Sequence, residues 1–226
     1  MKRYRLGAVL TVALLFCVGA GAQQPKVSRF DVFTGFSYLA APKMNLYQRG
    51  FNGQAGVNLN SWLALGFDYS VFTGSSVLSP SELTDEHQAE LAPYAPMLPP
   101  GFAVPFDAKT STYTAGPQVS IRKWKPVTFF LRPAVGILHE TVTARPKDAI
   151  STAIVVGLVG PTQKKSDVTL FYGVGGGFDL NLSDRFAWRT AADFVHVNLF
   201  DTVLREGRNC VRLSVGPTFR WGRSVQ

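Results

Sequence analysis

The sequence is poor in cysteine and has no clustered run of Lys and Arg, although its formal net charge is +8. Beyond residue 22 it also lacks an apolar run of about 18 residues, the length that indicates a transmembrane helix. The dispersed basic charge argues against a nucleic-acid-binding surface, which concentrates Lys and Arg on one face. The missing apolar run excludes a helical integral membrane protein. It does not exclude a membrane β-barrel, whose strands alternate apolar and polar residues.

The N-terminus has the layout of a secretory signal peptide. A basic segment, MKRYR, precedes the apolar run LGAVLTVALLFCVGA, and the tripeptide AGA that ends at residue 22 provides a cleavage site. We therefore expect residues 1–22 to be a cleaved signal peptide and residues 23–226 to form one domain; an uncleaved membrane anchor is the alternative. Cys210 is then the single mature cysteine, which excludes an intramolecular disulfide and a cysteine-based zinc site.

Large apolar residues alternate with small or polar ones along most of the mature chain, a pattern typical of β-strands. In LFYGVGGGFDLNL, residues 170–182, the even positions are large and apolar apart from Gly176, whereas glycine, Asp and Asn occupy most odd positions. The first strand is the least regular, because Phe33 falls among its small and polar positions. The pattern predicts eight strands, near residues 29–39, 51–60, 62–72, 110–122, 127–143, 168–182, 185–198 and 209–221.

The predicted connections alternate in length. SW, KWKP and SD are very short, whereas the others cover roughly residues 40–50, 73–109, 144–167 and 199–208. Short turns at one end and long loops at the other are typical of up-and-down membrane barrels. We therefore predict an all-β fold, an eight-stranded antiparallel up-and-down transmembrane β-barrel with a polar, side-chain-filled interior and long extracellular loops.

In such a barrel the large apolar residues face lipid and the opposite face fills a narrow interior. That face carries charges of both signs, and a buried charge is costly unless it is paired. The candidates for interior ion pairs are Asp31, Asp68, Arg122, Arg132, Glu140, Asp179, Arg189, Asp193, Arg212 and Arg220. The aromatic candidates for the membrane interfaces are Tyr38, Trp62, Tyr69, Trp124, Trp188 and Trp221. Ordinary packing is the alternative for each aromatic residue taken alone.

Two long connections contain further patterns. Ser79 and Glu82 have the spacing of a capping box, and Pro80 suits the first helical position, so we expect a short helix near residues 80–91. In the next long connection, the apolar stretch Ala153–Val159 is expected to extend the hairpin as strand; contact with another protein is the alternative. Loops are where binding residues usually lie, so residues 73–109 and 144–167 are candidates for binding an extracellular ligand.

Two segments carry a resemblance to a known family. YGVGGGFDLNLSDRFAWRTAADF and the closing CVRLSVGPTFRWG resemble the OmpA-type outer-membrane β-barrel superfamily. The resemblance implies an eight-stranded barrel in the outer membrane of a Gram-negative bacterium. It also implies contact with outer-membrane lipid and lipopolysaccharide and insertion by the barrel-assembly machinery.

Catalytic signatures are weak in this sequence. Barrel enzymes that deacylate lipid A use a His followed two positions later by Ser, whereas Asn198 follows His196 here. The GVGGG segment lies within a predicted strand and is no nucleotide-binding turn. We therefore expect no cofactor, no metal site and a non-enzymatic structural or loop-mediated surface-binding role. A lipid-modifying enzyme, a narrow pore and a soluble lipocalin-like binder are the alternatives.

Overall fold

The computed structural model describes residues 27–201, 203–204 and 207–225, and the predicted signal peptide lies outside them. In the described chain the sheet has eight strands. They are β1 (Val27–Ala41), β2 (Leu46–Asn58), β3 (Leu63–Leu78), β4 (Val104–Trp124), β5 (Val127–Ala144), β6 (Lys164–Asn181), β7 (Phe186–Val197) and β8 (Arg208–Val225). The α-helices are α2 (Asp85–Leu91) and α3 (Ala149–Val159).

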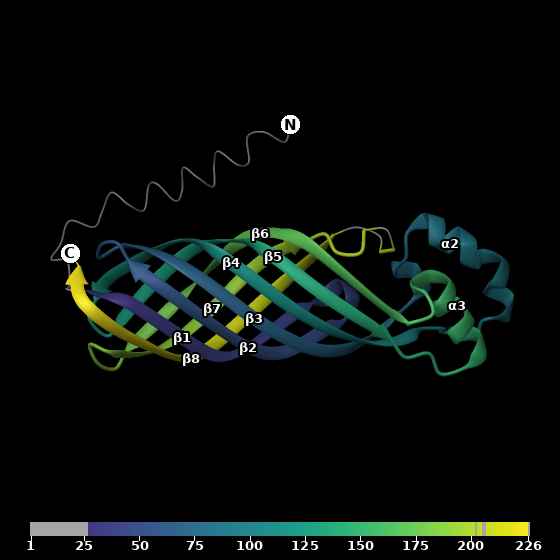
Figure 1. Ribbon diagram of the computed structural model, residues 1–226, viewed down its shortest axis with the longest axis horizontal. Helices are drawn as coiled ribbons and strands as arrows, with labels where there is room; N and C mark the ends of the chain where they lie inside the picture. Colours follow the sequence, from purple (N-terminus) through teal and green to yellow (C-terminus); the bar gives the residue numbers. More distant parts are fainter. Residues whose placement is uncertain (1–26, 202, 205–206, 226) are drawn as a thin grey trace, which may run out of the picture.

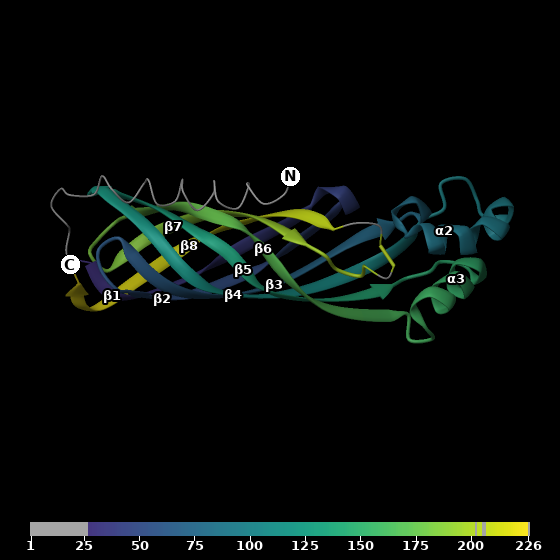
Figure 2. The ribbon, with the colours of Figure 1, turned by 90° about the horizontal axis from the view of Figure 1, so that it is seen from above.

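The sheet is a closed barrel. Each strand is antiparallel to its neighbours in sequence, and β1 also pairs with β8, which leaves no free edge. Figure 1 and Figure 2 show a long cylinder with the short turns and the C-terminus at one end and both α-helices at the other. We call these the turn end and the helical end. The predicted all-β, eight-stranded, antiparallel up-and-down fold is confirmed.

Three connections at the helical end are shorter than predicted, because the strands run further. The first of them spans residues 42–45 and not 40–50, with a 3-10 turn at Pro42–Met44 and Asn45 in the left-handed region at φ 49°. Likewise β3 ends at Leu78 and β4 begins at Val104, so residues 79–103 form the next connection. The strands were predicted to end where their outward positions stop carrying large apolar residues. In the structure the strands stay paired beyond those points.

The helix predicted near residues 80–91 is present in two pieces. The Ser79 N–H donates to Glu82 Oε2 at 3.0 Å, and this capping contact closes a 3-10 turn at Pro80–Glu82. The α-helix starts only at Asp85, with Thr84 as its N-cap. The capping pair therefore marks the start of the 3-10 turn, and the α-helix has a separate start, with its N-cap at Thr84.

The apolar stretch Ala153–Val159 is helical, so the expected strand extension is wrong. It belongs to α3, which begins after Asp148, whose carboxylate accepts from the Ser151 N–H at 2.7 Å. Gly160, at φ 94°, follows the last helical residue. An N-cap Asp and a terminal Gly are helix boundary signals, and they outweigh the β-propensity of the valines between them. Among the residues that the structure describes, no helix is both long and apolar enough to span a membrane.

The cap of α3 leads to a prediction about pH. Hydrogen bonds from Ser151 hold the pKa of Asp148 below its ordinary value of 3.8. A lowered pKa means that the ionised cap stabilises α3 above the ordinary pKa and stops doing so as the pH falls through the lowered one. We expect the hydrogen-exchange protection of the Ser151 amide to fall below about pH 3.8 and to be constant above pH 5.

The control is Asp148→Asn, which keeps a capping oxygen that does not titrate. Its Ser151 protection should not change over the same acidic range. Equal losses of protection in the two proteins would show that the carboxylate at residue 148 is not the titrating group.

Candidate functional site

The outer surface of the barrel is apolar over its turn-end part. Large side chains project outward from every strand, and some are very exposed, with Phe51 at 71% and Leu170 at 72%. The residues of this apolar belt include Phe30, Phe36, Phe51, Leu65, Phe67, Ile121, Leu131, Val135, Val174, Leu180, Phe194, Leu213 and Phe219. Soluble monomers rarely expose a continuous apolar surface of this kind.

Towards the helical end the outward face of the sheet becomes polar and the inward face becomes largely apolar. In β4, for example, the outward residues change to Ser111, Lys109 and Asp107, whereas Phe106 and Val104 are buried inside. In β5 and β6 the outward residues likewise become hydroxyl-bearing or charged, as at Thr141, Thr143, Ser166 and Lys164. The barrel is thus apolar outside and polar inside at one end, and polar outside and apolar inside at the other.

The polar half of the interior is organised around one arginine. Arg212 donates to Asp68 Oδ1 at 2.7 Å and to Asp193 Oδ2 at 2.8 Å, and all three side chains are buried. Arg132 approaches the same two carboxylates, at 3.4 Å from Asp68 and 3.2 Å from Asp193. Gln54 donates to Asp68 at 2.9 Å. Two cations and two anions therefore neutralise one another across the barrel.

A second group of charges lies nearer the turn end. Asp179 accepts from Arg189 at 2.7 Å and from Arg220 at 2.6 Å. Arg189 also lies 3.9 Å from Asp31, and its guanidinium is 4.8 Å from the ring centre of Phe130 and 5.9 Å from that of Phe33. Phe33, which breaks the alternation of β1, is thus an inward residue that packs against an arginine.

The predicted interior residues differ in their partners. Arg122 donates to the Ser61 carbonyl at 2.8 Å and to Asn58 Oδ1 at 3.3 Å, so its hydrogen bonds go to neutral oxygens. Glu140 pairs with Arg208 at 3.2 Å, at the apolar end of the barrel. Arg208 was missed because it fell in a predicted loop. Its even spacing from Cys210 and Arg212 is the signal that could have placed it inside.

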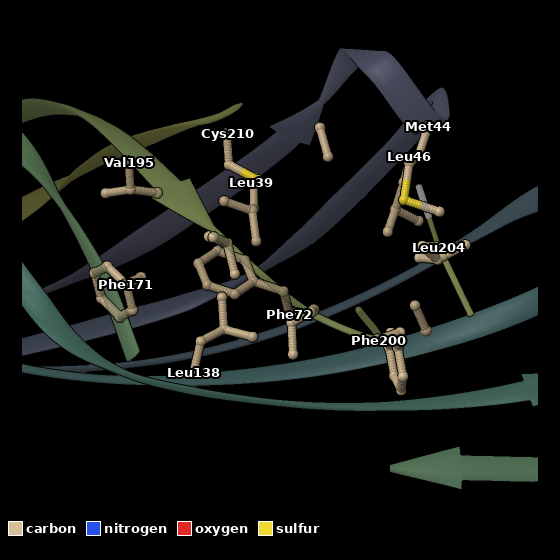
Figure 3. Close-up of a cluster of buried hydrophobic side chains, with 14 of the residues drawn as sticks. Leu39, Met44, Leu46, Phe72, Leu138, Phe171, Val195, Phe200, Leu204 and Cys210 are labelled. Carbon is tan, nitrogen blue, oxygen red and sulfur yellow. The ribbon is translucent and has the colours of Figure 1, made fainter. Parts of the chain in front are cut away.

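Between these charges and the helices the interior is filled with hydrocarbon. The buried cluster includes Leu39, Met44, Leu46, Phe72, Leu138, Phe171, Val195, Phe200, Leu204 and Cys210. Figure 3 shows these side chains inside the ring of strands. The expected polar interior therefore describes the turn-end half, and the apolar half was not foreseen.

The connections of the helical end are joined to one another. The Thr84 N–H donates to the Val203 carbonyl at 2.9 Å, and Leu83 forms an isolated β-bridge with Leu204. Beneath them lies a cavity of about 100 Å³ with almost entirely apolar walls. Its walls come from the ends of several strands, from α3, from the connection between β3 and β4 and from the connection after β7. They include Leu78, Leu83, Phe102, Phe106, Ile154, Val155, Leu158, Phe200 and Leu204.

The predicted interface aromatics lie on the outer surface. Trp62, Trp124, Trp188 and Trp221 are exposed near the turn end. Tyr69 is exposed further along β3, where it contacts Tyr113 with 4.9 Å between the ring centres. Tyr38 is partly buried and stacks on Tyr47 at 6.3 Å. The two tyrosine pairs lie on the helical-end side of the tryptophans.

The outward histidine contacts an amide oxygen and an aromatic ring. His196 Nδ1 is 2.8 Å from Asn209 Oδ1, and its ring lies 5.5 Å from that of Tyr172. Within the described residues, no three His, Cys, Asp or Glu side chains are grouped so that they could hold a metal ion.

One glycine of β6 leaves room for an interior carboxylate. A methyl group at Gly175 would overlap the Asp193 carboxylate, which is held in place by Arg132 and Arg212. We expect Gly175→Ala to lower the free energy of unfolding in lipid vesicles by about 1–3 kcal/mol, the usual cost of overpacking. Gly53→Ala is the control, because a Cβ there meets nothing within 4 Å. Equal losses in the two variants would contradict this account of Gly175.

A double-mutant cycle tests the coupling of the central charges. Arg212→Gln leaves two buried carboxylates with weaker compensation, and we expect a loss of about 3–5 kcal/mol in the free energy of unfolding. Adding Asp193→Asn should cost less in that variant than in the unchanged protein, with a coupling of about 1–3 kcal/mol. Asp107→Asn removes an outward carboxylate paired with Arg145, and its effect should simply add to that of Arg212→Gln. If Asp193→Asn and Asp107→Asn were both additive with Arg212→Gln, the shared network would be refuted.

No protein-family model matches the sequence, and no curated protein matches it. Solved structures do match. The structure resembles that of Neisserial surface protein A, with a TM-score of 0.55 and 12% identity over 86% of this chain and 98% of that chain. It also resembles the outer membrane protein OprG from Pseudomonas aeruginosa, with a TM-score of 0.51 and 9% identity over 87% and 97% of the two chains. The chain therefore has the fold of the eight-stranded, OmpA-like outer-membrane β-barrels.

Proposed function

We propose that this protein is an integral outer-membrane β-barrel of a Gram-negative bacterium, exported by a cleaved signal peptide and non-enzymatic. The observation that carries this proposal is the reversal of polarity along the barrel. An apolar outer face with a polar interior is stable only in lipid, because in water the exposed hydrocarbon would be unfavourable. The opposite arrangement at the helical end suits water outside and a protein core inside.

The dimensions of the apolar belt support the same conclusion. On β4 it runs from Tyr113 to Trp124, and on β6 from Leu170 to Leu180. A tilted strand needs about 9–11 residues to cross the hydrocarbon of a bilayer. Exposed tryptophans at one border and tyrosine pairs near the other fit the aromatic belts of membrane barrels. In this arrangement the belt contacts outer-membrane lipid and lipopolysaccharide, and the barrel-assembly machinery inserts the chain.

We further propose that the helical end faces the outside of the cell and binds a ligand there. The structural support is that hydrogen bonds join the connections at this end to one another and to the strands. The Phe200 N–H donates to Asp167 Oδ2 at 2.6 Å, and the Leu83 and Leu204 connections are bridged. Exposed apolar side chains at this end, such as Tyr94 and Ile150, offer contact area to a partner.

A pore is the weaker alternative. The central ion pairs of Arg212 and the apolar layer around Phe72, Leu138 and Phe171 fill the interior. Eight-stranded barrels are only wide enough to be filled by their side chains. A soluble lipocalin-like binder is disfavoured by the exposed belt.

Cell fractionation tests the location. We expect the protein in the outer-membrane fraction, with a mobility on unheated gels that differs from that of the boiled sample, because a lipid-embedded barrel stays folded until heated. Recovery as a soluble periplasmic protein without such a shift would overturn the proposal.

Cysteine labelling tests the orientation. Cys210 is buried, so we expect it not to react, and any labelling reports the introduced cysteine. We expect Ala153→Cys, at the helical end, to react with a membrane-impermeant maleimide on intact cells. The matched turn-end variant Lys125→Cys should react only after the outer membrane is opened. The reverse result would place the turn end outside.

A further inference from the structure

The cavity at the helical end is enclosed by segments that are far apart in the sequence. α3 contributes Ile154 and Leu158 to its walls, the connection between β3 and β4 contributes Leu83, and the connection after β7 contributes Phe200 and Leu204. A hydrogen bond and an isolated β-bridge join the two connections, so the folded chain itself holds the walls in place. The cavity is partly open, and a ligand can therefore enter it without unfolding the barrel. Apolar, preformed pockets are the usual form of small-molecule sites.

The charged side chains at the border of the cavity interact with other groups of the protein. Glu140 accepts from Arg208 Nη2 at 3.2 Å and from the Thr110 hydroxyl at 2.9 Å. Glu140 and Arg208 are each only 3% exposed, and Lys165 has an interaction of its own. The surface that a ligand meets is almost entirely hydrocarbon, so a polar group entering from water would lose its hydrogen bonds without replacement. The class of ligand that fits is neutral and apolar.

The volume of the cavity sets the size of the ligand. The cavity measures about 100 Å³, and Leu158, Ile154 and Phe106 are among its walls. In another protein an apolar cavity of about 150 Å³, lined by Leu, Ile and Phe, stays dry and binds benzene or xenon. A water molecule needs polar partners, which these walls do not offer. A single ring or a short alkane fits such a space, whereas a whole phospholipid does not.

We propose that the helical-end cavity binds a small, neutral hydrocarbon of the size of one aromatic ring, the alkylbenzene class. The ring packs against Phe106, Leu158 and Leu204, and no charged group of the protein takes part in its recognition. The inference deepens the proposed function and rests on it, since it names the class of ligand that the helical end takes up from outside the cell.

The isoleucines of the sequence are built-in reporters for the test, because they number four and lie in different surroundings. Ile154 lines the cavity, Ile150 is exposed on α3, and Ile121 and Ile137 are exposed on the apolar belt. The protein is labelled with ¹³C at the isoleucine δ1 methyl groups, placed in lipid nanodiscs and titrated with toluene. We expect the Ile154 signal to shift saturably and the Ile150 signal to stay in place. The two belt signals should shift in proportion to the toluene added, because toluene also dissolves in lipid.

Three probes that share a ring separate the chemical classes, namely toluene, phenol and benzoate. We expect phenol to bind at least tenfold more weakly than toluene, because its hydroxyl would be buried without a partner. Benzoate should give no saturable shift of Ile154. Equal binding of toluene and phenol, or no saturable shift with any probe, would overturn the proposal. So would an Ile154 shift that follows the protein concentration and not the toluene, because it would make this end an interface between copies.

A pair of variants on α3 localises the binding. Leu158→Trp fills the cavity and should abolish the saturable response of Ile154 to toluene. Val156→Trp is the control, because Val156 is exposed on the same helix and does not line the cavity. Its response should equal that of the unchanged protein. Equal loss in the two variants would show that the cavity is not where toluene binds.

An enlarging variant tests the size limit from the other direction. Leu158→Ala removes wall atoms and leaves a larger cavity. We expect naphthalene to bind this variant at least tenfold more tightly than it binds the unchanged protein. Unchanged naphthalene binding would contradict the assigned size of the site. If Leu158→Trp does not fold, this variant still decides the outcome.

The heat-dependent gel shift separates the two levels of proposal. A protein that keeps the gel shift but shows no saturable response at Ile154 contradicts the cavity proposal alone. A protein that is soluble and shows no gel shift contradicts the outer-membrane proposal itself.

Discussion

The pairing of charges inside a narrow ring is the constraint on which the rest of this barrel depends. The network joins residues of four strands, Arg212 on β8, Arg132 on β5, Asp68 on β3 and Asp193 on β7, so it forms only when the sheet has closed. A buried carboxylate without a partner would cost several kcal/mol. Gly175 of β6 is part of the same arrangement, because it leaves the space that the Asp193 carboxylate occupies.

Reversal of polarity divides the barrel into two physical regimes. Near the turns, ion pairs hold the interior together and hydrocarbon faces outward. Near the helices, the interior packs like the core of a soluble protein, with Phe72, Phe171 and Leu138 in one buried hydrophobic cluster. The same strands pass through both regimes, and β4, with 21 residues, is longer than a membrane crossing requires. The helical end is therefore a continuation of the barrel and not a set of loose loops.

Prediction succeeded where the period of two is clear and failed where the local signal is ambiguous. The strand pattern of β6 and β7 and the inward position of Asp179, Arg189 and Asp193 follow directly from alternation. The start of β4 at Val104 was missed, because the outward residues there are polar and the predicted alternation stopped at residue 110. The valines of α3 suggested strand, but Asp148 and Gly160 bound a helix.

The sequence by itself determined the number of strands, their antiparallel order, which face of each strand is inward and, Arg208 excepted, the residues of the buried ion pairs described above. These are local properties, because side chains alternate with a fixed period along any strand. Which arginine meets which carboxylate was decided only by the tertiary structure, as was the apolar cavity at the helical end. Both depend on the register with which eight strands close into a ring and on the contact between connections far apart in sequence, and no periodicity encodes either.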